Sequence, residues 1–226
     1  MKNDINAERK IIEKIQRMSG KYSMHQIFSD WIGLMAAGIS AQSERYNQTV
    51  AAKREEHYLA IVNKYSKEEV NDMVEMMSLL AMELEDNMRD VLGEIYMKAG
   101  CGSARTGQFF TPYHLSHMTA KVAYEGNIQR WKDMQQIEIN EPSTGGGGMI
   151  IAVAQVMREN DINFQQKMHV VAQDLDWNGV YMTYVQLSLL GIKAIVAQGD
   201  TLAEPYKNGY DENRVYRTPR ETGVLI

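Results

Sequence analysis

Cysteine is almost absent from this sequence: Cys101 is the only one in 226 residues, so the chain cannot form an internal disulfide bond. No uninterrupted apolar run approaches the roughly 20 residues that a membrane-spanning helix needs. The N-terminal segment MKNDINAERKIIEKI is charged and helical in character, which is not typical of a signal peptide. These absences together predict a protein of the reducing cytoplasm.

Positive charge is also scarce. The chain has 24 Lys and Arg against 29 Asp and Glu, a net charge of -5 and a pI near 5.6. An acidic balance gives no support for strong, autonomous binding to nucleic acid, although it leaves room for a local basic face. The hydrophobic content of 44% and charged content of 23% are typical of a globular protein with one large or two small domains.

Residues 1–100 are predicted to form a helical N-terminal region. Ala7–Met18 and 57–65 are amphipathic, and Ser66 with Glu69 has the form of a capping box at the start of another helix. The sixteen methionines are more typical of a helical core than of a Met-rich binding groove.

Residues 101–226 alternate between strand and helix patterns. Strands are expected at about 136–140, 169–173 and 194–197, with a helix after each of the first two. A further helix is expected up to about Tyr124, with Thr111 as its N-cap and Pro112 at its first position. Strand, helix, strand, helix, strand predicts a parallel sheet with right-handed crossovers.

Four consecutive glycines, Gly145–Gly148, follow the first predicted strand. Ligands bind at the carboxyl ends of parallel strands, so the glycines indicate close approach of a ligand to the backbone. A dinucleotide-binding loop is the first candidate, but four glycines satisfy many patterns. Glu141 just before the loop would repel a pyrophosphate, whereas it suits an ammonium or sulfonium group such as that of S-adenosylmethionine.

Five motifs then follow in order: TGQFFTP, NEPSTGGGGM, AQDLDW, LLGI and QGDTL. In order and approximate spacing they resemble the adenine-N6 DNA methyltransferases, in particular the modification subunit of type I restriction-modification systems. The resemblance covers about 91–202. It implies that residues 101–226 form a shortened Rossmann-like domain that binds S-adenosylmethionine.

The resemblance also implies roles for individual residues. The TGQFFTP segment would touch the methionine part of the cofactor, and the glycine loop would lie under it. Asp174 would hold the ribose hydroxyls, Leu175 would pack on the adenine ring, and Asp200 would bind the adenine amino group. The cofactor-binding residues implied in this way are Phe109, Phe110, Thr111, Glu141, Pro142, Gly145, Gly147, Asp174, Leu175 and Asp200.

The family's Asn/Asp-Pro-Pro-Tyr/Phe motif, which polarises the target amine and stacks on the flipped base, does not occur in these 226 residues. The nearest match is Ala203-Glu204-Pro205-Tyr206, which comes one strand too early, and a short fourth strand is expected at 222–226. Two hypotheses stay open. The chain is an adenine-N6 DNA methyltransferase whose catalytic loop is degenerate or supplied by a partner. Alternatively, it is a non-catalytic cofactor-binding module that acts as a regulatory or restriction-decoy subunit.

Partners are expected because a sheet of three or four strands leaves a strand edge uncovered. The expectation is self-association, or pairing with another methyltransferase or a specificity chain through which DNA would be contacted. His114 and His117 lie one helical turn apart, but no Cys, Asp or Glu follows at matching spacing, so no metal site is expected.

Overall fold

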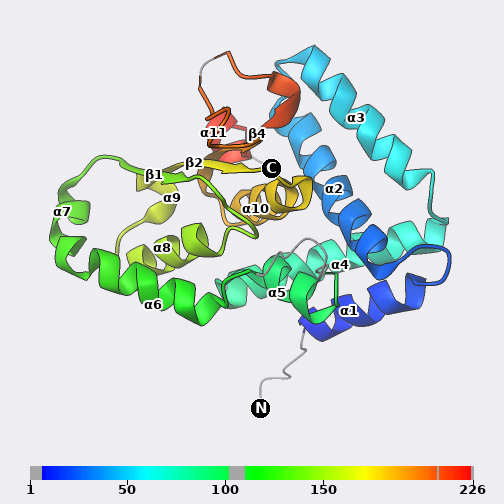
Figure 1. Cartoon of the computed structure of the whole chain (residues 1–226), viewed down its shortest axis with the longest axis horizontal. Helices are drawn as coiled ribbons and strands as arrows, with labels where there is room; N and C mark the ends of the chain where they lie inside the picture. Colours follow the sequence, from blue (N-terminus) through cyan, green and yellow to red (C-terminus); the bar gives the residue numbers. More distant parts are fainter. Residues whose placement is uncertain (1–6, 102–109, 208, 225–226) are drawn as a thin grey trace.

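The computed structural model describes residues 7–101, 110–207 and 209–224, which form an α/β fold with a helical N-terminal region (Figure 1). The helices of the N-terminal region are α1 (Ala7–Met18), α2 (Met24–Ser43), α3 (Gln48–Val62), α4 (Lys67–Asp86) and α5 (Val91–Lys98). The later helices are α6 (Tyr113–Tyr124), α7 (Ile128–Asp133), α8 (Gly148–Glu159), α9 (Phe164–Lys167), α10 (Trp177–Leu189) and α11 (Pro219–Thr222), with 3-10 turns at Glu125–Asn127 and Glu212–Arg214.

Helix α2 is buried over most of its length and packs against α1, α3 and α10. The Trp31 indole on α2 donates a hydrogen bond to the Met73 carbonyl of α4 over 3.1 Å. The predicted capping box begins α4: Glu69 N donates to Ser66 Oγ over 3.2 Å, and Ser66 N donates to Glu69 Oε2 over 2.7 Å. The prediction of a helical N-terminal region is confirmed.

The sheet contains four strands in the order β1-β2-β3-β4: β1 (Ile137–Glu141), β2 (Met168–Asp174), β3 (Lys193–Gln198) and β4 (Val215–Arg217). The first three are parallel, and each begins and ends within one residue of its prediction. The crossover helices α8 and α10 lie on the same side of the strands in Figure 1. The apolar residues of alternate strand positions, such as Val170 and Val196, are fully buried beneath them. The predicted α/β class is confirmed.

The fourth strand differs from the expectation. It lies at Val215–Arg217 and runs antiparallel to β3, whereas the expected strand was 222–226, of which 225–226 lie outside the described residues. Pro219 instead begins the short helix α11, which ends at Thr222 and is capped by Gly223 in the left-handed conformation (φ 74°). Arg54 of α3 fixes β4 in place, because its guanidinium lies 3.6 Å from the centre of the Tyr216 ring and donates to the Val215 carbonyl over 2.8 Å.

A smaller difference concerns the start of α6. The helix begins at Tyr113, with Pro112 in the cap position and no side-chain capping bond. The Pro112 carbonyl accepts from Leu115 N over 2.8 Å. The predicted N-cap, Thr111, therefore lies one residue before the cap.

One continuous core joins the helical region to the sheet. Helix α10 packs against α2, α4 and α5 on one side and against β2 and β3 on the other (Figure 1). The division into residues 1–100 and 101–226 stays a prediction. In the part of the chain that the structure describes, no helix combines the length and the apolar character needed to cross a membrane.

Candidate ligand-binding site

A cavity of about 330 Å³ lies above the glycine loop, at the carboxyl ends of β1 and β2. Its volume falls within the range of small-molecule sites. The described residues that line it are Asp90, Phe110, Thr111, Ser116, Ser143, Thr144, Gly145, Gly146, Gly148, Met149, Asp174 and Gly179. They come from the start of α5, the segment before α6, α6 itself, the glycine loop, the start of α8, the end of β2 and α10.

Asp174, the last residue of β2, brings a carboxylate to the cavity wall. Its Oδ2 accepts from Gly145 N over 2.7 Å, and its Oδ1 accepts from Asp176 N over 2.9 Å. A Cβ on Gly179 would lie only 2.8 Å from Asp174 Cγ, so the glycine makes room for the carboxylate. Burial raises the pKa of Asp174, and the backbone N–H groups oppose that rise. Each oxygen keeps acceptor capacity for ligand hydroxyls.

The glycines of the loop are needed for two physical reasons. Gly145 (φ 53°) and Gly147 (φ 89°) adopt the left-handed conformation. At Gly146 the need is space, because an added Cβ would lie 2.5 Å from Asp90 Oδ2. The Phe110 ring packs over Gly145, because a Cβ added to Gly145 would lie 2.9 Å from the nearest ring atom.

Two side chains of α10 hold the loop from below. Thr183 Oγ1 donates to the Gly145 carbonyl over 3.0 Å. The fully buried Gln186 amide donates to the Gly146 carbonyl over 2.7 Å and to Asp90 Oδ1 over 2.9 Å, and it accepts from Leu92 N over 3.1 Å. One glutamine therefore joins the glycine loop to the first turn of α5.

Asp90 is the second carboxylate of the cavity and is only 4% exposed. Its Oδ1 caps α5 by accepting from Gly93 N over 2.8 Å. Burial raises the pKa of Asp90, and the bonds from Gln186 and Gly93 oppose the rise. Reasoning from sequence missed both Asp90 and Gln186. Asp90 directly precedes an apolar helical segment, which is a capping pattern, but no neighbouring residue in the sequence indicates its contact with the glycine loop.

The structure brings together part of the predicted set. Phe110, Thr111, Gly145 and Asp174 line the cavity, and Phe109 lies outside the described residues. The other predicted residues do not line it: Glu141, Pro142, Gly147, Leu175 and Asp200.

The predicted residues outside the cavity have local roles. Glu141 is half-buried and accepts from Ser143 N over 3.3 Å. The Pro142 carbonyl accepts from Thr201 Oγ1 over 2.6 Å, which ties the loop after β1 to the loop after β3. Gly147 precedes α8 as its cap residue.

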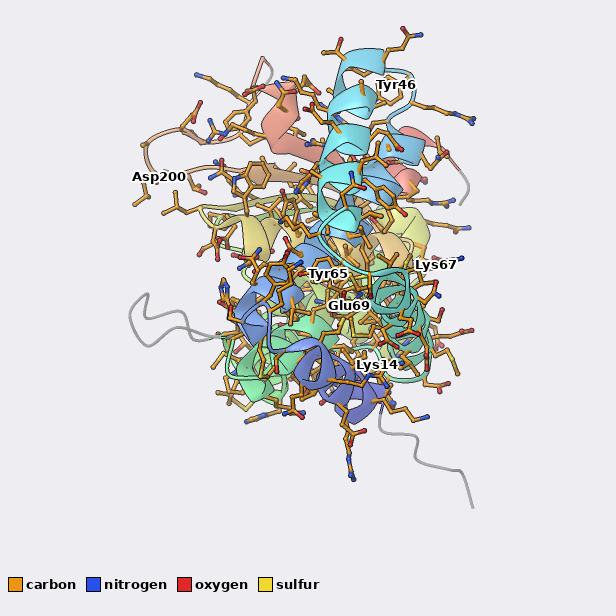
Figure 2. All side chains as sticks on the ribbon, turned by 90° about the vertical axis from the view of Figure 1, so that its right-hand side faces the viewer. Lys14, Tyr46, Tyr65, Lys67, Glu69 and Asp200 are labelled. Carbon is orange, nitrogen blue, oxygen red and sulfur yellow. The ribbon has the colours of Figure 1, made fainter. Side chains whose placement is uncertain are left out.

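Leu175 and Asp200 face solvent. Leu175 is 68% exposed. Asp200 caps the turn after β3, where its Oδ1 accepts from Leu202 N over 2.9 Å. Figure 2 places it on a loop at the left-hand edge of the view.

The segment nearest to the family's catalytic motif does not reach the cavity. Gln173 Nε2 donates to the Glu204 carbonyl over 2.9 Å, and Tyr206 N donates to Gln173 Oε1 over 2.9 Å. Glu204 also pairs with Arg214 over 2.9 Å. These bonds fold Ala203–Tyr206 back against the end of the sheet.

The two histidines of α6 also do not form a metal site. His117 Nε2 lies 3.0 Å from Glu159 Oε1 of α8, while His114 is exposed. Across the described ranges, no three His, Cys, Asp or Glu side chains gather as a metal-binding group.

A larger cavity, of about 450 Å³, lies near the opposite ends of β2 and β3. Its lining includes Asn163, Gln165 and Gly191, which precede those strands, and Arg220 is its only charged side chain among the described residues. Parallel sheets bind ligands at their carboxyl ends, so the smaller cavity above the glycine loop is the candidate site.

The chain belongs to the N-6 DNA methylase family, whose model matches residues 87–217, more than half of its length. The resemblance to adenine-N6 DNA methyltransferases is thereby confirmed. The match contains every described residue that lines the cavity, including Asp90. Among curated proteins there is no match.

Two solved structures are similar to this chain. One, described as a class I S-adenosylmethionine-dependent methyltransferase from Listeria monocytogenes, has a TM-score of 0.48 at 14% identity over 88% of this chain and 55% of its own. The other, the type I restriction-modification methyltransferase subunit from Streptococcus thermophilus, has a TM-score of 0.49 at 13% identity over 91% and 60%. The chain thus spans less than two thirds of either structure, and the family assignment rests on the family match.

Proposed function

We propose that this chain binds S-adenosylmethionine in the cavity above the glycine loop, as a methyltransferase-like member of its family. The observation that carries the proposal is the charge of the cavity. Its described lining holds two carboxylates, Asp90 and Asp174, and no Lys or Arg. Such a lining suits a cationic sulfonium ligand with ribose hydroxyls and disfavours a pyrophosphate.

The fit is supported by the shape of the loop as well. Gly145 and Gly146 leave no side chain between the backbone and the cavity, and Phe110 provides an apolar wall opposite. Asp174, with acceptor capacity on both oxygens, would hold the ribose hydroxyls. The cofactor itself would supply the activated methyl group, and these residues would bind and orient it.

Calorimetric titration of the wild-type chain and of Asp174→Ala with S-adenosylmethionine tests the proposal. Removing the carboxylate should weaken binding by about 1.5–3 kcal/mol, the value of charge-assisted hydrogen bonds. Asp200→Ala is the informative companion, because Asp200 faces solvent and should change affinity by less than about 0.5 kcal/mol. A wild-type chain that does not bind the cofactor would refute the proposal. A large loss of affinity in Asp200→Ala would support the contact between Asp200 and the adenine amino group that the family resemblance implies.

We also propose that these 226 residues bind the cofactor without methylating DNA on their own. The amine-polarising motif does not occur in the sequence, and Ala203–Tyr206 is held away from the cavity by Gln173 and Arg214. Methyl transfer without amine polarisation and base stacking would lose several kcal/mol of transition-state stabilisation. Labelled cofactor and DNA should give little or no transfer with the purified chain. Robust adenine methylation would contradict this and would return Ala203–Tyr206 to consideration as the catalytic loop.

A partner chain is the third part of the proposal: a second copy, another methyltransferase or a specificity subunit that contacts DNA. Among the described strands β1 pairs only with β2, so one edge of β1 is open. Helix α6 also exposes Leu115, Met118 and Val122 at helical spacing, by 41%, 58% and 74%. Light scattering should show self-association, or complex formation with such a subunit. A compact monomer at high concentration that binds no such subunit would argue against it.

A further inference from the structure

Two polar side chains of the cavity, Asp90 and Ser116, have no role in the family resemblance and are almost completely buried, at 4% and 1% exposure. Both hydrogen bonds to the Asp90 carboxylate from described residues, those of Gly93 and Gln186, go to Oδ1. Ser116 Oγ on α6 is buried and has no hydrogen-bond partner among the residues that the structure describes. A buried hydroxyl without a partner is costly, and it commonly marks a site that a ligand completes.

The two groups serve the same part of the cavity. The point that a Cβ on Gly148 would occupy lies 3.3 Å from Asp90 Oδ2 and 3.7 Å from Ser116 Oγ. A Cβ on Gly146 would lie 2.5 Å from the same Asp90 oxygen. The glycine loop therefore brings its backbone next to a carboxylate oxygen and a hydroxyl that both retain capacity to accept hydrogen bonds.

We propose that Asp90 and Ser116 form the subsite for the α-ammonium group at the amino-acid end of the ligand. An ammonium group donates three hydrogen bonds and carries a positive charge, so a carboxylate and a hydroxyl oxygen match it in both respects. Asp174, which comes from the end of β2, is left for the ribose. Glu141, which the sequence indicated as the partner of a cationic group, does not line the cavity. This inference rests on the proposed binding of S-adenosylmethionine and adds the residues that recognise its amino-acid part.

The test compares three ligands by calorimetry: S-adenosylmethionine, S-adenosylhomocysteine, which keeps the ammonium but lacks the sulfonium charge, and 5′-methylthioadenosine, which lacks the amino-acid part. Asp90→Asn is the conservative variant, because asparagine retains an oxygen to cap α5. Asp90→Asn should lower the affinity for the first two ligands by a similar factor of about 10 to 100 and leave the affinity for 5′-methylthioadenosine within about twofold of the wild-type value.

Every other pattern with Asp90→Asn overturns the inference. Weakening of S-adenosylmethionine alone would mean that Asp90 faces the sulfonium. An equal loss of affinity for all three ligands would mean that Asp90 only supports the glycine loop. Unchanged affinities would mean that Asp90 does not contact the ligand. The proposed function fails separately, and only if the wild-type chain does not bind S-adenosylmethionine.

Ser116→Ala gives a second test in which stability and binding move in different directions. Removal of an unpartnered buried hydroxyl should leave the thermal midpoint unchanged or raise it, while affinity for the two ligands with an ammonium group falls severalfold. Ser29→Ala is the matched control, since Ser29 Oγ on α2 is also buried without a partner in the described ranges but does not line the cavity. It should leave all three affinities unchanged. Unaltered binding in Ser116→Ala would exclude Ser116 from the subsite.

Discussion

Gln186 is the side chain whose loss should disturb the site most, because among the described residues it is the one whose hydrogen bonds join the glycine loop to the first turn of α5. Replacement by methionine keeps the volume and removes three hydrogen bonds. Asp90 keeps its bond from Gly93, but the Gly146 carbonyl and the Leu92 N–H each lose the partner that Gln186 provides.

The expected cost follows from those two backbone groups. Each buried group left unpaired costs about 1–3 kcal/mol, so Gln186→Met should lower the free energy of unfolding by about 2–6 kcal/mol. For a chain of this size about 1 kcal/mol shifts the thermal midpoint by about 2–4 °C, which predicts a fall of roughly 5–20 °C. Thermal and urea unfolding, followed by circular dichroism, measure this change.

Gln129→Met is the matched control. Gln129 lies on α7 and is exposed, and its side-chain amide donates to Asp133 over 3.3 Å, so its replacement should change the free energy of unfolding by less than about 0.5 kcal/mol. A loss below about 1 kcal/mol in Gln186→Met would refute the reasoning, because it would show that these bonds do not hold the loop.

Two further predictions concern the loop and the buried carboxylate. Gly145→Ala should lower the free energy of unfolding by about 1–3 kcal/mol and weaken cofactor binding, because an alanine is strained at φ 53° and its Cβ would lie 2.9 Å from the Phe110 ring. Gly126→Ala is the control at an open position, and unfolding and titration measurements should show a change within about 1 kcal/mol. Burial raises the pKa of Asp90, so the contribution of this carboxyl to the free energy of unfolding falls as the pH rises above about 4, where the carboxyl of the unfolded chain ionises before that of the folded chain. Asp90→Asn lacks this contribution. Urea unfolding at several pH values should therefore show the variant gaining stability relative to the wild type as pH rises; a constant or falling difference would contradict the assignment.

Much of the fold was predictable because its signals are local. The capping box at Ser66 and Glu69, the apolar strands and the glycine loop each depend on residues adjacent in sequence. The fourth strand was mispredicted because tertiary contacts decide it. Val215–Arg217 is held by Arg54, which lies about 160 residues earlier in the chain, and no pattern near the strand indicates that contact.

The site was predictable in part for the same reason. Gly145 and Asp174 follow successive parallel strands, so the topology alone places them at one end of the sheet. Asp90 and Ser116 come from helices outside the βαβ unit, and their approach to the loop depends on how α5 and α6 pack. Asp200 also follows a parallel strand, but its carboxylate caps the next turn, an alternative that is common for an acid at the end of a strand.

Calorimetric titration of the purified chain with S-adenosylmethionine, and separately with NAD, tests the central claim most directly. An acid-lined cavity predicts saturable binding of S-adenosylmethionine and no measurable heat with NAD, whose pyrophosphate would meet Asp90 and Asp174. Tight binding of NAD without any response to S-adenosylmethionine would contradict the claim and would indicate an oxidoreductase-like nucleotide binder instead.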